Sequence, residues 1–163
     1  MKRVLAAAVV VCLSSPAFAQ SGPQYFGNPN SAISSGVLIP GGSTFFWTSG
    51  TGPAVVNRDA PASSPERYGD TATQARSVLT RLGQQLADQG MSLKNVVYLR
   101  AYLVADSNKD GKLDTQGWNA AYREFFGTAE NPTKPGRTTV GVASLVGAGQ
   151  LIEVEIFAVK PAM

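Results

Sequence analysis

The last part of the sequence concentrates the residues that could do chemistry. Arg137 opens the segment RTTVGVASLVGAGQLIEVEIFAV, and Glu153 and Glu155 alternate with apolar residues near its end. A guanidinium can hold a carboxylate through two parallel hydrogen bonds, and a glutamate can orient water or transfer a proton. The same segment fits an apolar hairpin that closes a sheet, with Arg137 at the start of an edge strand and Glu153 paired with a neighbouring charge. The local pattern allows both interpretations.

The composition excludes several kinds of active site. The chain has no histidine, which rules out Ser-His-Asp and Cys-His nucleophile systems and most zinc or iron centres. Its single cysteine, Cys12, lies in the N-terminal segment, so the rest of the chain has no thiol, disulfide or zinc-thiolate site. Any chemistry must therefore use carboxylates, arginine, lysine, tyrosine, hydroxyls, backbone groups or water.

A second group of oxygen-bearing side chains lies in DSNKDGKLDTQG, residues 106–117. Oxygen ligands at alternate positions, with a glycine for the tight turn, suit a calcium ion. The twelfth position, where such a loop needs a bidentate glutamate, is Gly117. The alternative is a turn in which Asp and Asn side chains bond their own backbone. If the loop binds calcium, we expect a structural role, with these ligands: Asp106, Asn108, Asp110 and Asp114.

The N-terminus has the pattern of a secretory signal peptide at residues 1–19. Lys2 and Arg3 precede an apolar run, and the small residues AFA come directly before Gln20. The apolar run is too short for a retained membrane anchor. We therefore expect a periplasmic or secreted protein without a membrane segment after cleavage.

The charge balance argues against nucleic acid as a partner. Without Lys2 and Arg3 the 14 basic residues become 12 against 11 acidic ones, and the net charge falls from +3 to +1. The remaining basic residues are scattered singly, whereas phosphate binding needs a concentrated basic face.

The remaining sequence predicts one α+β domain over residues 32–160, preceded by a flexible arm at 20–31. Apolar residues recur at helical spacing after Asp70 and again from Thr115, and Gly90 suits the end of the first helix. Runs rich in β-branched and aromatic residues predict strands at 43–50, at 95–106 and at two places within 137–159. This order fits a mixed sheet with both helices on one face. The other face is left uncovered and apolar, so we expect self-association.

Four pieces of the chain, in order, resemble the YjgF/Rid family of reactive-intermediate imine deaminases, also called the YjgF/YER057c/UK114 family. AISSGVLIPGGSTFFWTSGTGP is similar to the family's opening strands, and ATQARSVLTRLGQQLADQGMSLKNVVYLRAYL to its first helix and next strand. WNAAYREFFG resembles its second helix, and PGRTTVGVASL with LIEVEIFAV its C-terminal signature. The resemblance implies a chorismate-mutase-like fold, assembled as a barrel-like homotrimer with clefts between subunits.

The resemblance also implies an activity. Arg137 falls on the arginine that holds the substrate carboxylate, and Glu153 on the residue that orients or activates water. Gly50, Thr51 and Thr139 fall near the substrate pocket. The implied reaction converts small 2-imino or enamine acids to 2-oxo acids and ammonia, without any required cofactor. Glu155, on the same strand face as Glu153, is expected to pair with another charge or to lie at an interface.

The chain departs from the family pattern at two places in the implied pocket. Ser34, Ser35 and Gly36 replace a common Gly-Pro-Tyr, so the tyrosine that closes the pocket is missing. Thr139 stands where the family has cysteine or serine. A non-catalytic trimer that binds small carboxylate metabolites is therefore the alternative function.

Overall fold

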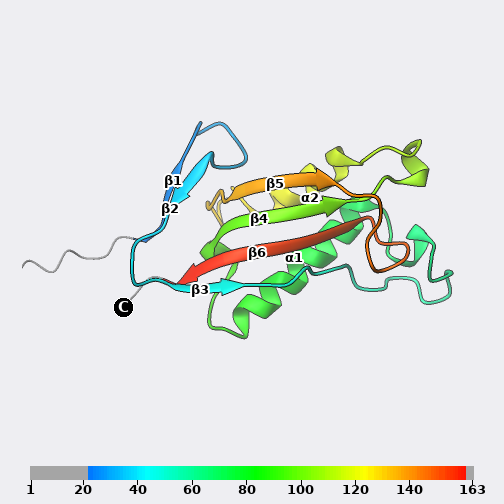
Figure 1. Cartoon of the computed structure of the whole chain (residues 1–163), viewed down its shortest axis with the longest axis horizontal. Helices are drawn as coiled ribbons and strands as arrows, with labels where there is room; N and C mark the ends of the chain where they lie inside the picture. The colour runs from blue at the N-terminus through cyan, green and yellow to red at the C-terminus, as the bar shows by residue number, and fades with distance from the viewer. Residues whose placement is uncertain (1–21, 161–163) are drawn as a thin grey trace, which may run out of the picture.

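A computed structural model describes residues 22–160, in which two helices cover one face of a four-stranded sheet (Figure 1). The predicted signal peptide lies outside the described residues. Within 22–160, no helix has both the length and the apolar character needed to span a bilayer. The helices are α1 (Thr71–Ala87) and α2 (Thr115–Phe125), with short 3₁₀ helices η1 (Pro65–Arg67), η2 (Leu93–Asn95) and η3 (Ser107–Lys109). The strands are β1 (Gln24–Phe26), β2 (Gly36–Leu38), β3 (Thr44–Trp47), β4 (Val96–Leu103), β5 (Gly136–Gly141) and β6 (Ile152–Lys160).

The four-stranded sheet has the order β3-β6-β4-β5. β6 pairs antiparallel with both β3 and β4, whereas β5 pairs parallel with β4. The predicted hairpin of the last two strands is therefore wrong, because β4 lies between β5 and β6. A parallel pair needs a long crossover, and α2 with its flanking loops provides it between β4 and β5. Arg137 consequently lies on an edge strand, beside β4 alone in this sheet.

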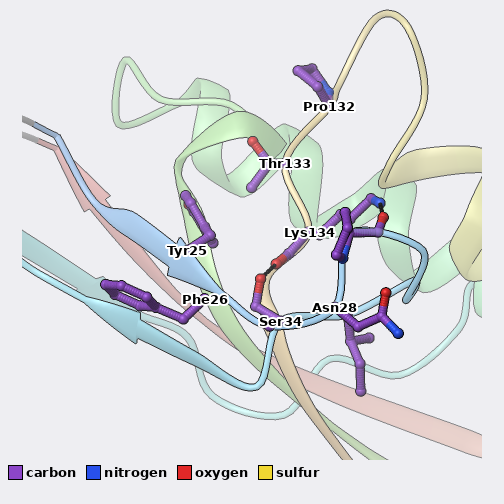
Figure 2. Close-up of a pocket in the computed structure, with 10 residues that line it drawn as sticks. Tyr25, Phe26, Asn28, Ser34, Pro132, Thr133 and Lys134 are labelled. Carbon is purple, nitrogen blue, oxygen red and sulfur yellow. Dashed lines mark hydrogen bonds between the residues drawn. The ribbon is translucent and has the colours of Figure 1, made fainter.

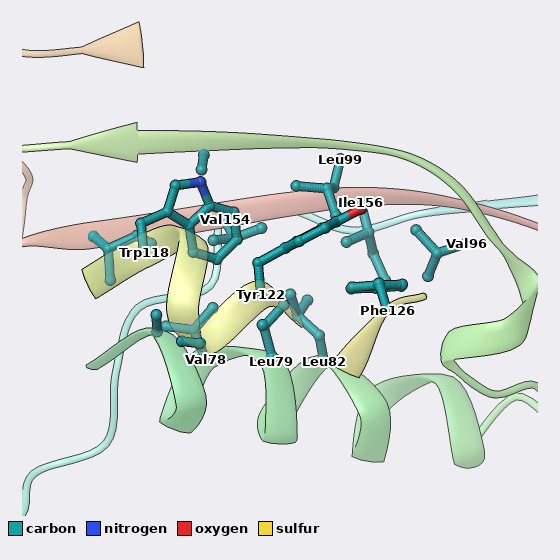
Figure 3. Close-up of a cluster of buried hydrophobic side chains, with 14 of the residues drawn as sticks. Val78, Leu79, Leu82, Val96, Leu99, Trp118, Tyr122, Phe126, Val154 and Ile156 are labelled. Atoms are coloured by element: carbon teal, nitrogen blue, oxygen red, sulfur yellow. The ribbon is translucent and has the colours of Figure 1, made fainter. Parts of the chain in front are cut away.

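The core lies between the sheet and the two helices (Figure 3). The apolar residues of α1 at helical spacing are fully buried, as the periodicity predicted: Ala75, Val78, Leu79, Leu82 and Leu86. α2 contributes Trp118, Ala121 and Tyr122, and the sheet contributes alternate residues of β4 and β6 such as Leu99, Val154 and Ile156. Each strand therefore presents one face to the helices and the other face away from them.

Polar groups fix the two ends of α1. Asp70 is its N-cap, and its carboxylate accepts a hydrogen bond of 2.8 Å from the backbone N–H of Thr73. Gly90, just beyond the helix, has φ of +66°, a conformation that favours glycine. Gln74 is fully buried, and its Oε1 accepts a 2.7 Å hydrogen bond from the backbone N–H of Leu151. This bond ties the first turn of α1 to the residue before β6, the strand that carries Glu153.

The face of the sheet that points away from the helices keeps large apolar side chains exposed. Phe45 and Trp47 of β3 are each 61% exposed, and Val140 of β5 is also exposed. The ring centres of Trp47 and Phe157 lie 4.1 Å apart. We call this surface the open face; the helices cover the opposite side.

Part of the predicted N-terminal arm is structured. β1 pairs antiparallel with β2 and forms a two-stranded hairpin at one end of the main sheet (Figure 1). The hydroxyl of Tyr25 donates to the carbonyl of Val96 at 3.2 Å, and burial raises its pKa. The Gly- and Asn-rich composition of residues 22–31 did not indicate this strand, because its pairing with β2 and its contact with β4 are not local.

Candidate functional site

Arg137 and Thr139 lie on the helix side of the edge strand β5. In the parallel register, Arg137 pairs with Leu99 and Thr139 with Ala101, and both partners on β4 belong to the core. Thr139 is fixed by α2, because Nε1 of Trp118 donates to its hydroxyl at 3.0 Å. The two residues therefore face α2 and share one environment.

The Arg137 guanidinium is held by three side chains of α2. Its Cζ lies 4.5 Å from the ring centre of Tyr122 and 5.4 Å from that of Trp118, which are cation–π distances. Its Nη2 donates to Oδ1 of Asn119 at 2.7 Å. Trp118 and Tyr122 are separated by one helical turn, and their rings meet edge to face with their centres 5.6 Å apart, so both can contact the guanidinium.

No carboxylate of the described residues pairs with Arg137. The ion pairs within 22–160 are Arg76–Glu124 at 2.8 Å and Arg100–Glu155 at 2.9 Å. The Nη1 atom of Arg137 is buried and has no hydrogen-bond partner among these residues. Burial lowers the pKa of this guanidinium, and the charge of Arg123 acts in the same direction. A buried donor without a partner is costly, so the site favours an anionic group from elsewhere.

Glu153 lies on the open face, with its carboxylate next to Gly50. Glu153 pairs with Tyr102 in the β4–β6 register, and its carboxylate makes no hydrogen bond or ion pair with any residue in 22–160. An ideal Cβ built at Gly50 would lie 2.0 Å from its Oε1. The chain after β3 brings Gly50 there, because Thr51 exchanges backbone hydrogen bonds of 2.9 and 3.1 Å with Val154. Thr51 itself is buried, and its hydroxyl accepts a long, 3.5 Å bond from Gln85 of α1.

Glu155 pairs with a charged side chain, as expected from its place beside Glu153 on one strand face. Its Oε1 accepts hydrogen bonds from Nη1 of Arg100 at 2.9 Å and from the hydroxyl of Tyr102 at 3.1 Å. All three side chains lie on the open face, since they occupy alternate positions of paired strands. Glu155 is therefore already neutralised within the chain, in contrast to Glu153.

The candidate residues thus form two groups on opposite sides of the sheet. Arg137 and Thr139 face α2, whereas Glu153 and the backbone of Gly50 are on the open face. One chain does not bring the guanidinium and the Glu153 carboxylate together. No local sequence pattern indicates this division, because the side on which Arg137 lies depends on its parallel pairing with β4.

A pocket of about 280 Å³ lies where β2 meets the start of β5. Its lining includes Arg137 together with the Ser34, Ser35 and Gly36 that replace the common Gly-Pro-Tyr. Tyr98 and Thr138 also line it, and the Tyr98 hydroxyl donates to Oγ1 of Thr138 at 2.7 Å. Neither Tyr98 nor Asn119 was among the residues expected at the site, because a lone tyrosine in a strand and a lone asparagine in a helix carry no local signal.

A neighbouring pocket of about 260 Å³ lies between the β1–β2 hairpin and the loop before β5 (Figure 2). The Ser34 hydroxyl donates to the carbonyl of Lys134 at 2.5 Å, and Nζ of Lys134 donates to the carbonyl of Pro29 at 2.7 Å. These bonds fix the hairpin against the segment that leads into Arg137. We assign the contacts a structural role.

The 106–117 loop uses its acidic side chains to bind its own backbone. Asp106 is 1% exposed and accepts from the N–H of Asn108 at 2.8 Å, while Asp114 caps α2 by accepting from Gly117 at 2.9 Å. Asp110 has φ of +55°, which the short polar side chain tolerates. No cluster of three or more acidic, cysteine or histidine side chains in the described residues is arranged to hold a metal. Calcium binding here stays a prediction.

Residues 42–160 match the family model described as Endoribonuclease L-PSP. Similar solved structures include a conserved Rid-family protein of unknown function from Yersinia pestis, with 19% identity, a TM-score of 0.62, and coverage of 85% of this chain and 98% of that one. A protein of unknown function from Pseudomonas aeruginosa has 26% identity and a TM-score of 0.55, covering 81% of this chain and 84% of that one. A member of the YjgF/YER057c/UK114 family from Mycobacterium tuberculosis has 22% identity and a TM-score of 0.50, covering 84% and 98%.

These likenesses define an α+β protein with the family's two helices and mixed sheet. Because the family model spans most of the chain, the protein belongs to the YjgF/Rid (Endoribonuclease L-PSP) family.

Proposed function

We propose that this protein is an exported member of its family that hydrolyses small 2-imino or enamine acids to 2-oxo acids and ammonia. The observation that carries the proposal is the Arg137 guanidinium. Within residues 22–160, its buried Nη1 has no hydrogen-bond partner and no carboxylate neutralises its charge. A substrate carboxylate would supply that partner in the charge-assisted geometry that arginine favours. Since Nη1 is covered, binding of a carboxylate there requires the groups that cover it to move.

The reaction needs three further elements. A water attacks the carbon of the C=N bond, the nitrogen takes up protons, and the resulting tetrahedral carbon expels ammonia to leave the C=O group. Glu153 is the group we assign to orienting the water, because its carboxylate has no partner among the residues that the structure describes. Gly50 leaves the space that this carboxylate occupies. No metal or organic cofactor is required by this route.

Arg137 and Glu153 can act together only across an interface between copies, because they lie on opposite sides of one sheet. The proposal therefore includes a homotrimer in which a cleft between subunits joins an edge strand β5 to the open face of a neighbour. The exposure of Phe45 and Trp47 supports this assembly, since monomers rarely leave a contiguous aromatic patch uncovered.

Export is part of the proposal and rests on the first 19 residues alone. A protein secreted through a cleaved signal peptide would begin at Gln20. N-terminal sequencing of the periplasmic or extracellular protein tests this directly. A mature net charge of +1, with Arg76 and Arg100 already paired to carboxylates, does not favour the ribonuclease activity in the family's older name.

The same chain supports a second function, binding of small carboxylate metabolites without turnover. The opposite placement of Arg137 and Glu153 favours it, because Arg137 alone can bind a carboxylate. Ammonia release from freshly generated 2-iminopropanoate and 2-iminobutanoate separates the two functions. The deaminase proposal predicts an acceleration that Arg137→Ala abolishes; saturable binding of 2-oxobutanoate without acceleration would establish the binder instead.

A further inference from the structure

Asn119 is the only side chain among the described residues that hydrogen-bonds the Arg137 guanidinium. Its Oδ1 accepts from Nη2 at 2.7 Å, while the rings of Trp118 and Tyr122 lie beneath the guanidinium plane. This hydrogen bond fixes Nη2 of the guanidinium and leaves Nη1 without a hydrogen-bond partner in residues 22–160. The acceptor is a neutral amide, whereas Arg76 and Arg100 are bound by glutamates.

We propose that Asn119 is a positioning residue that holds the Arg137 guanidinium in place without neutralising its charge. This inference rests on the carboxylate-binding role of Arg137 proposed above and adds the residue that keeps that arginine available. Two properties of Asn119 matter: its hydrogen bond to Nη2, and the absence of a charge on its side chain. Each property can be removed separately by a substitution at position 119.

An aspartate at this position would keep the anchor and remove its neutrality. Its carboxylate would accept from the same Nη2 and compensate a half-buried charge that has no counter-ion in residues 22–160. Such an ion pair competes with an incoming carboxylate for the same cation. Asn119→Asp should therefore weaken carboxylate binding while the folded state is at least as stable, since it gains a partner for a buried charge.

An alanine at this position would remove the anchor and keep the charge. The guanidinium would then have to give up more side-chain freedom when it binds a ligand, and binding would weaken moderately. The folded state would also lose one charge-assisted hydrogen bond. Affinity and stability should therefore rank the two variants in opposite orders. Affinity for the carboxylate falls from the wild type to Asn119→Ala and further to Asn119→Asp, whereas stability is lowest for Asn119→Ala.

The experiment measures 2-oxobutanoate binding by titration calorimetry and thermal unfolding for the wild type, Asn119→Asp, Asn119→Ala and Arg137→Ala. Asn57→Asp is the matched control, since Asn57 is exposed and accepts only from the backbone N–H of Asp59, a bond that aspartate preserves. Because hydrogen bonds to charged groups dominate such sites, we expect about a tenfold or greater loss of affinity in Asn119→Asp. Asn57→Asp should bind like the wild type.

An Asn119→Asp protein that binds 2-oxobutanoate as tightly as the wild type would overturn the inference. So would a parallel loss of affinity and melting temperature in both Asn119 variants, which is what a purely structural residue predicts. If Arg137→Ala binds as well as the wild type, or if the wild type does not bind, the carboxylate site and this inference both fail. If the wild type binds 2-oxobutanoate but does not hydrolyse 2-imino acids, only the deaminase proposal fails. The affinities of the Asn119 variants then still test whether Asn119 positions Arg137.

Discussion

Glu153 occupies the space that a side chain at Gly50 would need. The ideal Cβ position of Gly50 lies 2.0 Å from Oε1 and 2.7 Å from Cδ of Glu153. Gly50 does not have a positive φ, so its backbone alone does not demand glycine. The close approach is therefore the reason for the glycine, and it links the loop after β3 to the position of the Glu153 carboxylate on β6.

Gly50→Ala should reduce turnover without unfolding the protein. The added methyl group displaces the Glu153 carboxylate, and a displacement of about 1 Å in a catalytic group can cost about a hundredfold in rate. The measurement is kcat for 2-iminopropanoate hydrolysis, alongside the melting temperature. Gly41→Ala is the control, because a Cβ there meets no atom within 4 Å. An unchanged kcat in Gly50→Ala would contradict a catalytic role for the Glu153 carboxylate at this position.

The two glutamates of β6 should differ in their effect on turnover. Glu153→Gln removes a carboxylate that has no partner within residues 22–160. We expect kcat to fall about a hundredfold or more, the usual contribution of a proton-transfer or water-activating group. Glu155→Gln disturbs the contacts with Arg100 and Tyr102 and should change kcat far less. Steady-state kinetics of both variants checks this. Equal losses of kcat in Glu153→Gln and Glu155→Gln would show that turnover depends on the open face in general and not on Glu153 specifically.

Asp70 should make the stability of α1 depend on pH. The N–H and hydroxyl of Thr73 stabilise its carboxylate and hold the pKa below the ordinary value of 3.8. A carboxyl group whose pKa is lowered by folding contributes stability above its unfolded pKa, and this is lost as the pH falls through the folded pKa. Asp70→Asn keeps a capping side chain that cannot titrate, so its stability should decline less between about pH 4 and pH 2.

Denaturant unfolding at several pH values tests this prediction. At neutral pH Asp70→Asn should stay close to the wild type, whereas Asp70→Ala should lose about 1 kcal/mol because the cap itself is gone. The acid decline will shrink without vanishing in Asp70→Asn, since Arg76 also lowers the pKa of Glu124. An identical acid decline in the wild type and Asp70→Asn would contradict the assignment.

Aspartates on the open face should prevent self-association. Phe45 and Trp47 are each 61% exposed in the single chain, and a charge placed there would have to be buried in the proposed trimer. We expect the wild type to have the mass of a trimer by light scattering and Phe45→Asp/Trp47→Asp to be smaller. Val146→Asp serves as the control, because Val146 is fully exposed and lies outside the sheet, on the loop between β5 and β6. A wild-type monomer would rule out a cleft between subunits.

The sequence predicted the local elements well and the strand order poorly. Ala75, Val78 and Leu82 of α1 are buried because helical spacing alone places them on one side. Of the two residues that could cap this helix, Asp70 and Thr71, the structure has Asp70 as the N-cap. The hairpin expected for the last two strands was wrong, since the insertion of β4 between them depends on contacts far apart in the chain. The pairing of Glu155 with a charge was confirmed.

The same limit applies to the candidate site. The family resemblance implied carboxylate binding by Arg137 and water activation by Glu153, but no local pattern shows that the two side chains face opposite sides of the sheet. Asn119 was missed for a similar reason. Its role depends on how α2 packs against β5, and a single amide in a helix does not signal that packing.

Recognition of a substrate carboxylate by Arg137 is the central step of the proposed reaction, so the most direct test removes the carboxylate from the substrate. The measurement is the ratio of kcat/KM for 2-iminopropanoate to that for its neutral amide, with the wild type and with Arg137→Ala. We predict a large ratio for the wild type that collapses towards unity in the variant, because only the charged substrate gains from the guanidinium. Equal acceleration of both substrates by the wild type, or a ratio unchanged by Arg137→Ala, would contradict the account.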